Sequence, residues 1–517
     1  MGTEQNDNTP SPVAQAPQPP RAGLTRRSLV IGGGLAGVVA LGVGAGIGVA
    51  VSRDDAKKPT PAPSAKPSDG LRHFHGTNLA MPAVAGWRVS DTQKGHLFVT
   101  QQTDTMGGKG FRGTIMDDRG EPVWIEPTGA NVTGLTVQTF EGKPVLTYWS
   151  GTSIGGHGEG VGRILDTSYE PVATVHAGDG LKADLHEFHL TTSGTALVTA
   201  YQTIPADLTS IGGPKKGYIY NCHAQEVDIR SGKVLFDWNV NDHVPVSDTY
   251  LGLKQDKGHD GTSASRAFDA YHINAIDYWD DMLLVSLRHT HTVYAVSKAD
   301  GSIRWRLGGK HSYFTVQPDA AFAWQHDARR QPDGTITLFD NHLYSGTNGQ
   351  SHGKRFRLDE TARTATLLTD LTFNRHLGTA MGSVQPMADG HTLVGWGVAP
   401  FVTEFDANGE VVYQADLGAM SYRAFRHDWT GAPKTKPEIS ASTSADTTAV
   451  HMSWNGATEI AHWRILAGET GSSLHEVATV PHSHFETLAR IAATKAVRAQ
   501  ALDKSGAVLG TTRAIKA

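Results

Sequence analysis

Three histidines and one arginine are the residues of this 517-residue chain whose chemistry is best suited to group transfer: His186, His272, His326 and Arg288. Imidazole is neutral near pH 7, so a histidine can act there as a nucleophile or as a proton carrier. The guanidinium of Arg288 presents a planar fork of N–H groups that binds the oxygens of an anionic group. This chemistry requires that the fold bring residues far apart in sequence together.

The elements that must position these residues are short strands. From residue 85 to 420, β-branched and aromatic runs end at D-G, N-G or S-G turns, and helical periodicity is nearly absent. The runs recur as units of roughly 40 to 55 residues, the size of a four-stranded propeller blade. The turn anchors of the six units are Gly95, Gly142, Gly194, Asp280, Gly334 and Gly390. The sequence therefore predicts an all-β fold, a six-bladed β-propeller.

The repeat also predicts where the histidines lie. Eight residues before each anchor stand, in order, Trp87, Gly134, His186, His272, His326 and Gly382. The innermost strand of every blade lines the central channel, so equivalent positions in different blades point at one another. We expect the three imidazoles to converge in the channel.

Four segments resemble the arylsulfotransferase family of exported six-bladed propellers. They are DLHEFHLTTSGTALVTAY (184–201), YHINAIDYWDDMLLVSLRHTHTVYAV (271–296), IRWRLGG (303–309) and FAWQHDARRQPDGTITLFDN (322–341). The similarity covers roughly residues 85 to 420 and includes H-x-N, S-x-R-H and Q-H-D elements in order.

The resemblance implies a sulfotransferase that is independent of PAPS and moves a sulfuryl group from an aryl sulfate ester to a phenolic acceptor. His326, in the Q-H-D element, looks like the family's sulfated nucleophile. His186, His272, Asn274 and Arg288 look like its sulfuryl-binding residues. The neighbour that first protonates the departing phenolate would later accept the proton of the incoming phenol, and either His272 or His186 could serve.

Strand alternation predicts the finer placement of these side chains. His272 and Asn274 would share one strand face, and Trp324 and His326 another, so that Asn274 supports the sulfate and Trp324 flanks the aryl ring. Arg288 and His289 would then face opposite ways. His289 and His291 would be packing residues or a metal pair, but no third ligand is apparent, so we expect neither a metal nor an organic cofactor.

The main alternative function is a non-catalytic exported propeller that binds a ligand or protein partner in its channel, because fold alone does not decide function. A serine hydrolase is disfavoured: the G-x-S-x-G match at residues 151–155 precedes a glycine-rich loop instead of a helix. A quinone-dependent dehydrogenase would need more blades and tryptophan-rich repeats. A net charge of −5 without a basic block argues against nucleic acid as a partner.

The N-terminal region resembles a twin-arginine export signal. Arg26 and Arg27 precede a glycine-rich apolar stretch without charges, long enough to cross a bilayer. The G-x-G-x-x-G match at residues 32–37 belongs to this stretch and lacks the strand and polar-faced helix of a dinucleotide site. We therefore expect residues 1–51 to be a signal or membrane anchor, with 29–51 as the tether. The protein would use the Tat translocase during export and end up outside the cytoplasm, secreted or anchored.

Three further segments complete the predicted organisation. Residues 52–70 form a Pro-rich linker, 71–430 the propeller and 431–517 a small β-sandwich. The last segment contains about seven short strands and resembles a fibronectin type III domain, with Trp454 and Trp463 as core residues. Cys222 is the only cysteine, so no intramolecular disulfide can form.

Overall fold

The computed structural model describes residues 70–88, 92–103, 110–255, 258–342 and 349–517. The predicted export signal and most of the linker lie outside the described residues. The described part consists of strands and short 3-10 helices, with no α-helix. Among these residues, no helix has the length and apolar character that crossing a membrane requires. The prediction of an all-β fold is confirmed.

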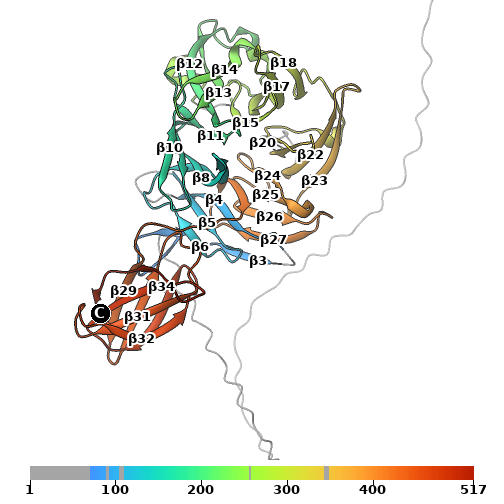
Figure 1. Cartoon of the computed structure of the whole chain (residues 1–517). Coiled ribbons are helices and arrows are strands. Elements are labelled where there is room, and N and C mark those ends of the chain that lie inside the picture. Colours follow the sequence, from blue (N-terminus) through green and yellow to red (C-terminus); the bar gives the residue numbers. More distant parts are fainter. Residues whose placement is uncertain (1–69, 89–91, 104–109, 256–257, 343–348) are drawn as a thin grey trace, which may run out of the picture. The chain divides into compact units, whose positions relative to one another are not determined.

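Six blades follow one another around a common centre and form the predicted propeller, with blades 2 and 3 joined edge to edge in one eight-stranded sheet (Figure 1). Blade 1 contains β28 (Ser421–His427), β4 (His96–Thr103), β5 (Gly110–Met116) and β6 (Pro122–Ile125). Blade 2 contains β7 (Val132–Phe140), β8 (Lys143–Ile154), β9 (His157–Leu165) and β10 (Pro171–Val175). Blade 3 contains β11 (Ala183–Leu190), β12 (Thr195–Ala206), β13 (Gly217–Asp228) and β14 (Val234–Asn239).

The chain continues through the remaining blades in the same way. Blade 4 contains β15 (Ile273–Trp279), β16 (Met282–Leu287), β17 (Thr292–Ser297) and β18 (Ile303–Gly308). Blade 5 contains β20 (His326–Arg330), β21 (Ile336–Asp340), β22 (His352–Asp359) and β23 (Thr364–Leu371), with β19 (Thr315–Val316) parallel to β23. Blade 6 contains β24 (Ser383–Pro386), β25 (Thr392–Gly395), β26 (Phe401–Phe405), β27 (Val411–Asp416) and β3 (Ala85–Arg88).

The ring is closed by strands from both ends of the propeller segment. The innermost strand of blade 1, β28, comes from its C-terminal end, and the outermost strand of blade 6, β3, comes from its N-terminal end. Trp87 therefore lies in β3, and the prediction that it occupies an inner-strand position is wrong. The other five predicted positions do lie in or immediately before the innermost strands of blades 2 to 6.

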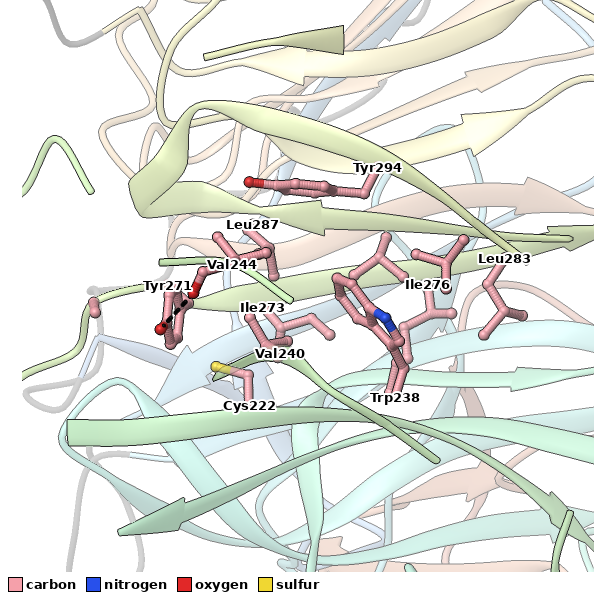
Figure 2. Close-up of a cluster of buried hydrophobic side chains, with 14 of the residues drawn as sticks. Cys222, Trp238, Val240, Val244, Tyr271, Ile273, Ile276, Leu283, Leu287 and Tyr294 are labelled. Atoms are coloured by element: carbon pink, nitrogen blue, oxygen red, sulfur yellow. Dashed lines mark hydrogen bonds between the residues drawn. The ribbon is translucent and has the colours of Figure 1, made fainter. Parts of the chain in front are cut away.

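Neighbouring blades are joined by apolar side chains. In blade 4, β16 reads MLLVSL and is buried almost throughout, because adjacent sheets cover both of its faces. Figure 2 shows the cluster between blades 3 and 4, which includes Cys222 and Trp238, and in which Tyr271 donates a hydrogen bond to the carbonyl of Val244 at 2.8 Å. Burial raises the pKa of the Cys222 thiol well above its ordinary value, so this residue behaves as a small apolar side chain.

The segment between blades 3 and 4 is long and contains three short 3-10 helices, η2 (Val240–Asp242), η3 (Val246–Asp248) and η4 (Ala264–Arg266). Further 3-10 turns are η1 (Thr209–Ile211), η5 (Arg288–Thr290), η6 (Pro318–Ala320) and η7 (Ala388–Gly390). Val240 and Val244 are fully buried in the cluster of Figure 2 and hold the start of this insertion against the propeller.

After the propeller, the chain forms a sandwich of two antiparallel sheets. One sheet has the order β29-β30-β33, and the other has the order β32-β31-β34-β35, with β36 paired to β34. Their bounds are β29 Glu438–Ser444, β30 Thr447–Ser453, β31 His462–Gly468, β32 His475–Pro481, β33 Glu486–Ala492, β34 Ala496–Leu502, β35 Val508–Thr511 and β36 Ile515–Lys516. Trp463 is fully buried between the sheets, and Trp454 packs at the edge of the same core. A further hairpin, β1 (Leu71–His73) and β2 (Ala80–Pro82), precedes β3.

Candidate active site

The three predicted histidines come together near the centre of the propeller. His186 lies in β11, His272 stands immediately before β15, and His326 begins β20. The rings of His186 and His272 are 4.8 Å apart between centroids and nearly perpendicular, at 79°. His326 is near enough to both that a charge on either would lower its pKa. Blades 3, 4 and 5 thus each contribute one imidazole to a buried group.

Two aspartates orient the first two histidines. Asp184 Oδ2 lies 2.6 Å from Nδ1 of His186, and Asp269 Oδ2 lies 2.5 Å from Nδ1 of His272. A carboxylate accepts hydrogen bonds, so each ring carries its proton on Nδ1 and, when neutral, a lone pair on Nε2. Sequence reasoning missed both aspartates, although the D-x-H and D-x-x-H spacings are visible in the sequence.

The environment of Asp184 keeps it ionised. Burial raises its pKa, but His186, together with hydrogen bonds from the backbone N–H groups of His186 and Gly158, brings the pKa below its ordinary value. The hydroxyl of Thr199 donates a further hydrogen bond at 2.9 Å. A fixed carboxylate in this position stabilises a positive charge on the imidazole that it contacts.

Asn341 orients His326. Its amide nitrogen donates to the carbonyls of Gly378 at 2.6 Å and Met381 at 3.0 Å, so its Oδ1 is the acceptor that lies 2.7 Å from Nδ1 of His326. The proton of His326 is therefore on Nδ1, and Nε2 has the lone pair, which the backbone N–H of Met381 approaches at 3.3 Å. Burial and the charge of Arg288 lower the pKa of His326 well below its ordinary value, so the ring is neutral at pH 7.

Arg288 is held by three neighbours. Its Nη1 donates to Nε2 of His289 at 2.9 Å, its Nη2 donates to the carbonyl of Thr379 at 3.1 Å, and the guanidinium lies 4.8 Å from the centre of the Trp324 ring. Burial lowers the pKa of Arg288 to about 10, which leaves it charged at pH 7. Its buried Nε–H has no hydrogen-bond partner among the described residues and is available to an anion.

Strand alternation does not describe the backbone at these positions. Residues 288–290 form the 3-10 turn η5, so Arg288 and His289 do not face opposite ways but hydrogen-bond to each other. His272 and Trp324 have φ of 55° and 58° and precede their strands, so neither shares a strand face with the residue two positions on. The predicted orientations were wrong because they assumed extended backbone.

Asn274 and Trp324 contact different parts of the site. The Asn274 amide donates to the carbonyl of Gln325 at 2.7 Å and so ties β15 to the residue before His326. Its buried Oδ1 has no hydrogen-bond partner among the described residues. Trp324 contacts the rings of His289 and His291 edge-on, at 5.4 Å and 4.7 Å, and forms an aromatic wall beside Arg288.

His289 belongs to the site, whereas His291 lies at its edge. His289 stacks on His272 at 4.8 Å and donates from Nδ1 to the Asp269 carbonyl at 2.6 Å, while His291 stacks on Tyr250 at 4.1 Å. Asp269, His272 and His289 are close enough together to share a metal ion. In the observed arrangement Nδ1 of His289 donates to the backbone carbonyl of Asp269, and only His272 hydrogen-bonds to its carboxylate, as in an Asp-His pair with a second, oriented histidine.

A buried ion network adjoins the histidines. Glu187 contacts Arg329 at 2.6 Å and Arg423 at 3.1 Å, and Asp327 contacts the same two arginines at 2.9 Å and 3.2 Å. Burial raises the pKa of Glu187, but the two arginines outweigh it and bring the pKa to about 2. The network joins the inner strands of blades 1, 3 and 5 and, with His186, lines a cavity of about 310 Å³.

Blade 1 contributes residues that sequence reasoning also missed. Tyr422 on β28 donates from its hydroxyl to the carbonyl of His186 at 3.1 Å, next to Arg423 of the ion network. They were missed because the inner strand of blade 1 was expected to precede β4 in the sequence. The G-x-S-x-G match forms the end of β8 and the hairpin turn into β9, with no following helix, so it is not a nucleophile elbow.

The family described as arylsulfotransferase (ASST) matches residues 136–418. No curated protein matches the sequence significantly. Among solved structures, a protein of unknown function from Bacteroides caccae shares 13% identity with a TM-score of 0.39, over 64% of this chain and 98% of the other. A virginiamycin B lyase from Staphylococcus aureus, solved with quinupristin, shares 10% identity with a TM-score of 0.33, over 72% of this chain and 96% of the other. The family match spans more than half of this chain and contains all six predicted site residues.

Proposed function

The chain belongs to the arylsulfotransferase family, a family of aryl-sulfate sulfotransferases, and we propose that it works through a sulfohistidine on His326. In this proposal a sulfuryl group passes from an aryl sulfate ester to a phenolic acceptor without PAPS. The observation that carries the proposal is the arrangement of His326. Its Nδ1 proton is held by Asn341, its Nε2 has the lone pair, and the charged Arg288 lies near enough to lower its pKa.

The first half-reaction follows from this geometry. Nε2 of His326 attacks sulfur, the N–S bond forms as the S–O bond to the aryl group breaks, and the aryl oxygen leaves with the electron pair. The non-bridging oxygens carry charge throughout a loose transition state, so fixed donors stabilise them. Arg288 supplies such donors, since its Nε–H has no hydrogen-bond partner among the described residues. Trp324 flanks the aryl ring.

His186 is the better of the two candidates for the proton transfers. Burial, the neighbouring His186 and Arg288 lower the pKa of His272 well below its ordinary value, so His272 is neutral at pH 7. Two histidines with ring centroids 4.8 Å apart also disfavour a charge on both. His186 is hydrogen-bonded through Nδ1 to the ionised Asp184, and in this proposal its Nε2–H protonates the departing phenolate. In the second half-reaction His186 takes the proton of the incoming phenol, whose oxygen attacks sulfur as the N–S bond breaks.

Intact-protein mass spectrometry tests the proposal without knowledge of the natural acceptor. Incubation with 4-nitrophenyl sulfate should add one sulfuryl group, about 80 Da, to the peptide that contains His326, and a phenol should remove it with ping-pong kinetics. His326→Ala should abolish the adduct. Arg288→Ala should slow its formation about 100- to 1,000-fold, as for the loss of one oxyanion donor. A folded protein that forms no adduct with a panel of aryl sulfates would favour a non-catalytic propeller that binds its ligand in the channel.

We also propose that the protein is exported by the twin-arginine route and remains outside the cytoplasm, secreted or tethered by residues 29–51. The arginine pair before an uncharged apolar stretch supports this. Replacing Arg26 and Arg27 by Lys should retain the protein in the cytoplasm, as measured by cell fractionation. Unchanged export would contradict the proposal.

The C-terminal sandwich is proposed to be a fibronectin type III-like module. Its division into a three-stranded and a five-stranded sheet around Trp463 supports this assignment. The side-chain amide of Asn455 donates to the carbonyl of Ile125, and its Oδ1 accepts from the N–H of the same residue, both at 2.8 Å, so we assign the module a packing role against blade 1.

A further inference from the structure

Two histidines and a glutamate meet where the β1–β2 hairpin contacts the sandwich. His75 lies in the loop of the hairpin, His451 in β30 and Glu486 in β33. Oε1 of Glu486 lies 3.0 Å from Nδ1 of His75 and 3.0 Å from Nδ1 of His451, and the two imidazole rings stack with centroids 4.1 Å apart. Three good ligands for a transition metal therefore converge from two parts of the fold.

From this convergence we propose that His75, His451 and Glu486 form a zinc site. Two imidazoles and one carboxylate are a donor set typical of zinc, which binds each at about 2.0–2.2 Å. In a tetrahedral site with such bonds, neighbouring ligand atoms lie about 3.3 Å apart. The two observed nitrogen-to-oxygen distances are 3.0 Å, so small side-chain rotations admit the ion. It replaces the two Nδ1 protons, which move to Nε2.

The surroundings of the carboxylate favour a bound cation. The side chain of Glu486 is only 8% exposed, and its second oxygen, Oε2, accepts the backbone N–H of Gly76 at 2.6 Å, which leaves Oε1 for the ion. The carboxylate is therefore fixed by a backbone donor, with one of its oxygens in contact with both imidazoles.

The site has a route for the ion and a further polar group at its base. The side chain of His75 is 71% exposed, so zinc and a water ligand reach the site from solvent. Ser453, which pairs with Glu486 across the sheet, is 1% exposed, and its Oγ has no hydrogen-bond partner among the described residues. An added Cβ at Gly76 would lie 3.6 Å from this Oγ, which places the hydroxyl beside the site.

The proposed site is a clamp and not part of the sulfuryl-transfer chemistry. The hairpin that carries His75 leads directly into β3, the strand that completes blade 6, while the other two ligands belong to the sandwich. Phe74 and Phe485, which flank two of the ligands in sequence, also pack together with ring centroids 4.6 Å apart. A bound ion therefore fastens the sandwich to the segment that closes the ring.

Metal titration of the full chain tests the clamp. Chelator-treated protein should bind one equivalent of Co²⁺ with the visible spectrum of a four- or five-coordinate histidine-carboxylate site, and Zn²⁺ should displace it. Zn²⁺ should also raise the melting temperature, because a ligand that binds only the folded state stabilises it. His75→Ala should weaken Zn²⁺ binding by at least about 10- to 100-fold, a range reached even when groups outside the ligand set are lost. This variant changes a mostly exposed loop residue, so it tests binding without disturbing the core.

Two controls separate the clamp from other metal binding. His475→Ala removes an exposed histidine from the same sandwich and should leave the Zn²⁺ response unchanged. His289→Ala removes a member of the other close Asp-His group, and it too should leave the bound equivalent in place. No bound equivalent in the wild-type protein, or a cobalt spectrum that persists in His75→Ala and is lost in His289→Ala, would overturn the proposal.

Discussion

Asn341 accepts a hydrogen bond from Nδ1 of His326 at 2.7 Å, and this contact determines which nitrogen of His326 has the lone pair. The amide cannot rotate to present its nitrogen instead, because its two N–H groups donate to the carbonyls of Gly378 and Met381. A residue that touches neither sulfur nor the aryl group in the proposed reaction therefore prepares the nucleophile. The relationship resembles that between an oriented histidine and its acidic partner in acyl transfer.

Loss of the Asn341 side chain should slow sulfuryl transfer to His326 without removing the nucleophile itself. In Asn341→Ala, His326 can carry its proton on Nε2, where it blocks attack, so we expect sulfohistidine formation to slow about 100- to 10,000-fold. The rate is measured by quenched-flow mass spectrometry with 4-nitrophenyl sulfate. Asn408→Ala, in an exposed turn, is the matched control and should react at the wild-type rate. A wild-type rate in folded Asn341→Ala would show that the tautomer of His326 is not limiting.

The pH dependence of adduct formation should reflect the lowered pKa of His326. Burial and Arg288 disfavour its protonated form, so the nucleophile stays neutral and the rate should not fall between pH 7.5 and about 6, where an ordinary histidine of pKa about 6.5 begins to protonate. Arg288→Met removes one cause of the lowered pKa of His326, and the acid limb of its slower reaction should move to higher pH. Rates with 4-nitrophenyl sulfate across this range measure both effects. An acid limb at or above pH 6.5 in the wild type would contradict the assignment.

His289 should act through Arg288. Its Nε2 accepts a hydrogen bond from the guanidinium of Arg288. His289→Ala leaves the positive charge of Arg288 in place but removes this contact, so the guanidinium is no longer held in a fixed orientation. We therefore expect adduct formation to be about 10-fold slower. Because both residues serve one function, the double variant with Arg288→Ala should be no slower than Arg288→Ala alone. His289→Gln, which keeps an acceptor, should recover part of the rate. Strictly additive effects of the two substitutions would indicate separate roles.

The ion network beside the site should be costly to break. Replacing Arg423 by Met leaves Glu187 and Asp327 with one arginine between them in a buried setting, and we expect unfolding to become easier by about 3–5 kcal/mol. Denaturant titration measures this loss. The exposed pair of Lys495 and Glu469 provides the control, because Lys495→Ala should leave the denaturation midpoint almost unchanged. Equal effects of the two substitutions would mean that the network is solvated.

Much of the fold could be predicted because each blade repeats one turn at one spacing. The turns at Gly142, Gly194 and Gly334 do separate the first two strands of their blades. Blade 1 could not be placed in this way, since its inner strand follows the neighbouring strand β4 by more than 300 residues, as the 321-residue separation of Thr100 and Ser421 shows. A local pattern contains no information about which distant strand completes a sheet.

The convergence of the three histidines could be predicted from the sequence, but the residues that orient them and the local backbone geometry could not. His186, His272 and His326 were found because they occupy the same position in repeated blades. Asp184 contacts the ring of His186, and the only trace of this contact in the sequence is the two-residue spacing between them. Orientations failed where the backbone leaves the strand, as at His272 with its positive φ. Such conformations are set by tertiary contacts, and period-two reasoning cannot anticipate them.

The closure of the ring by β28 also sets when the protein can become active during its synthesis. During synthesis the N-terminal part of the chain leaves the ribosome first. β4 therefore cannot pair with its inner neighbour, β28, until Ser421–His427 has left the ribosome. Until then the hydrogen bond from Tyr422 to the carbonyl of His186 cannot form, and neither can the ion pair between Arg423 and Glu187. Pairings of such long sequence separation form late and slowly. We therefore expect the contacts of β28 with His186 and Glu187 to form in one late step, instead of blade by blade.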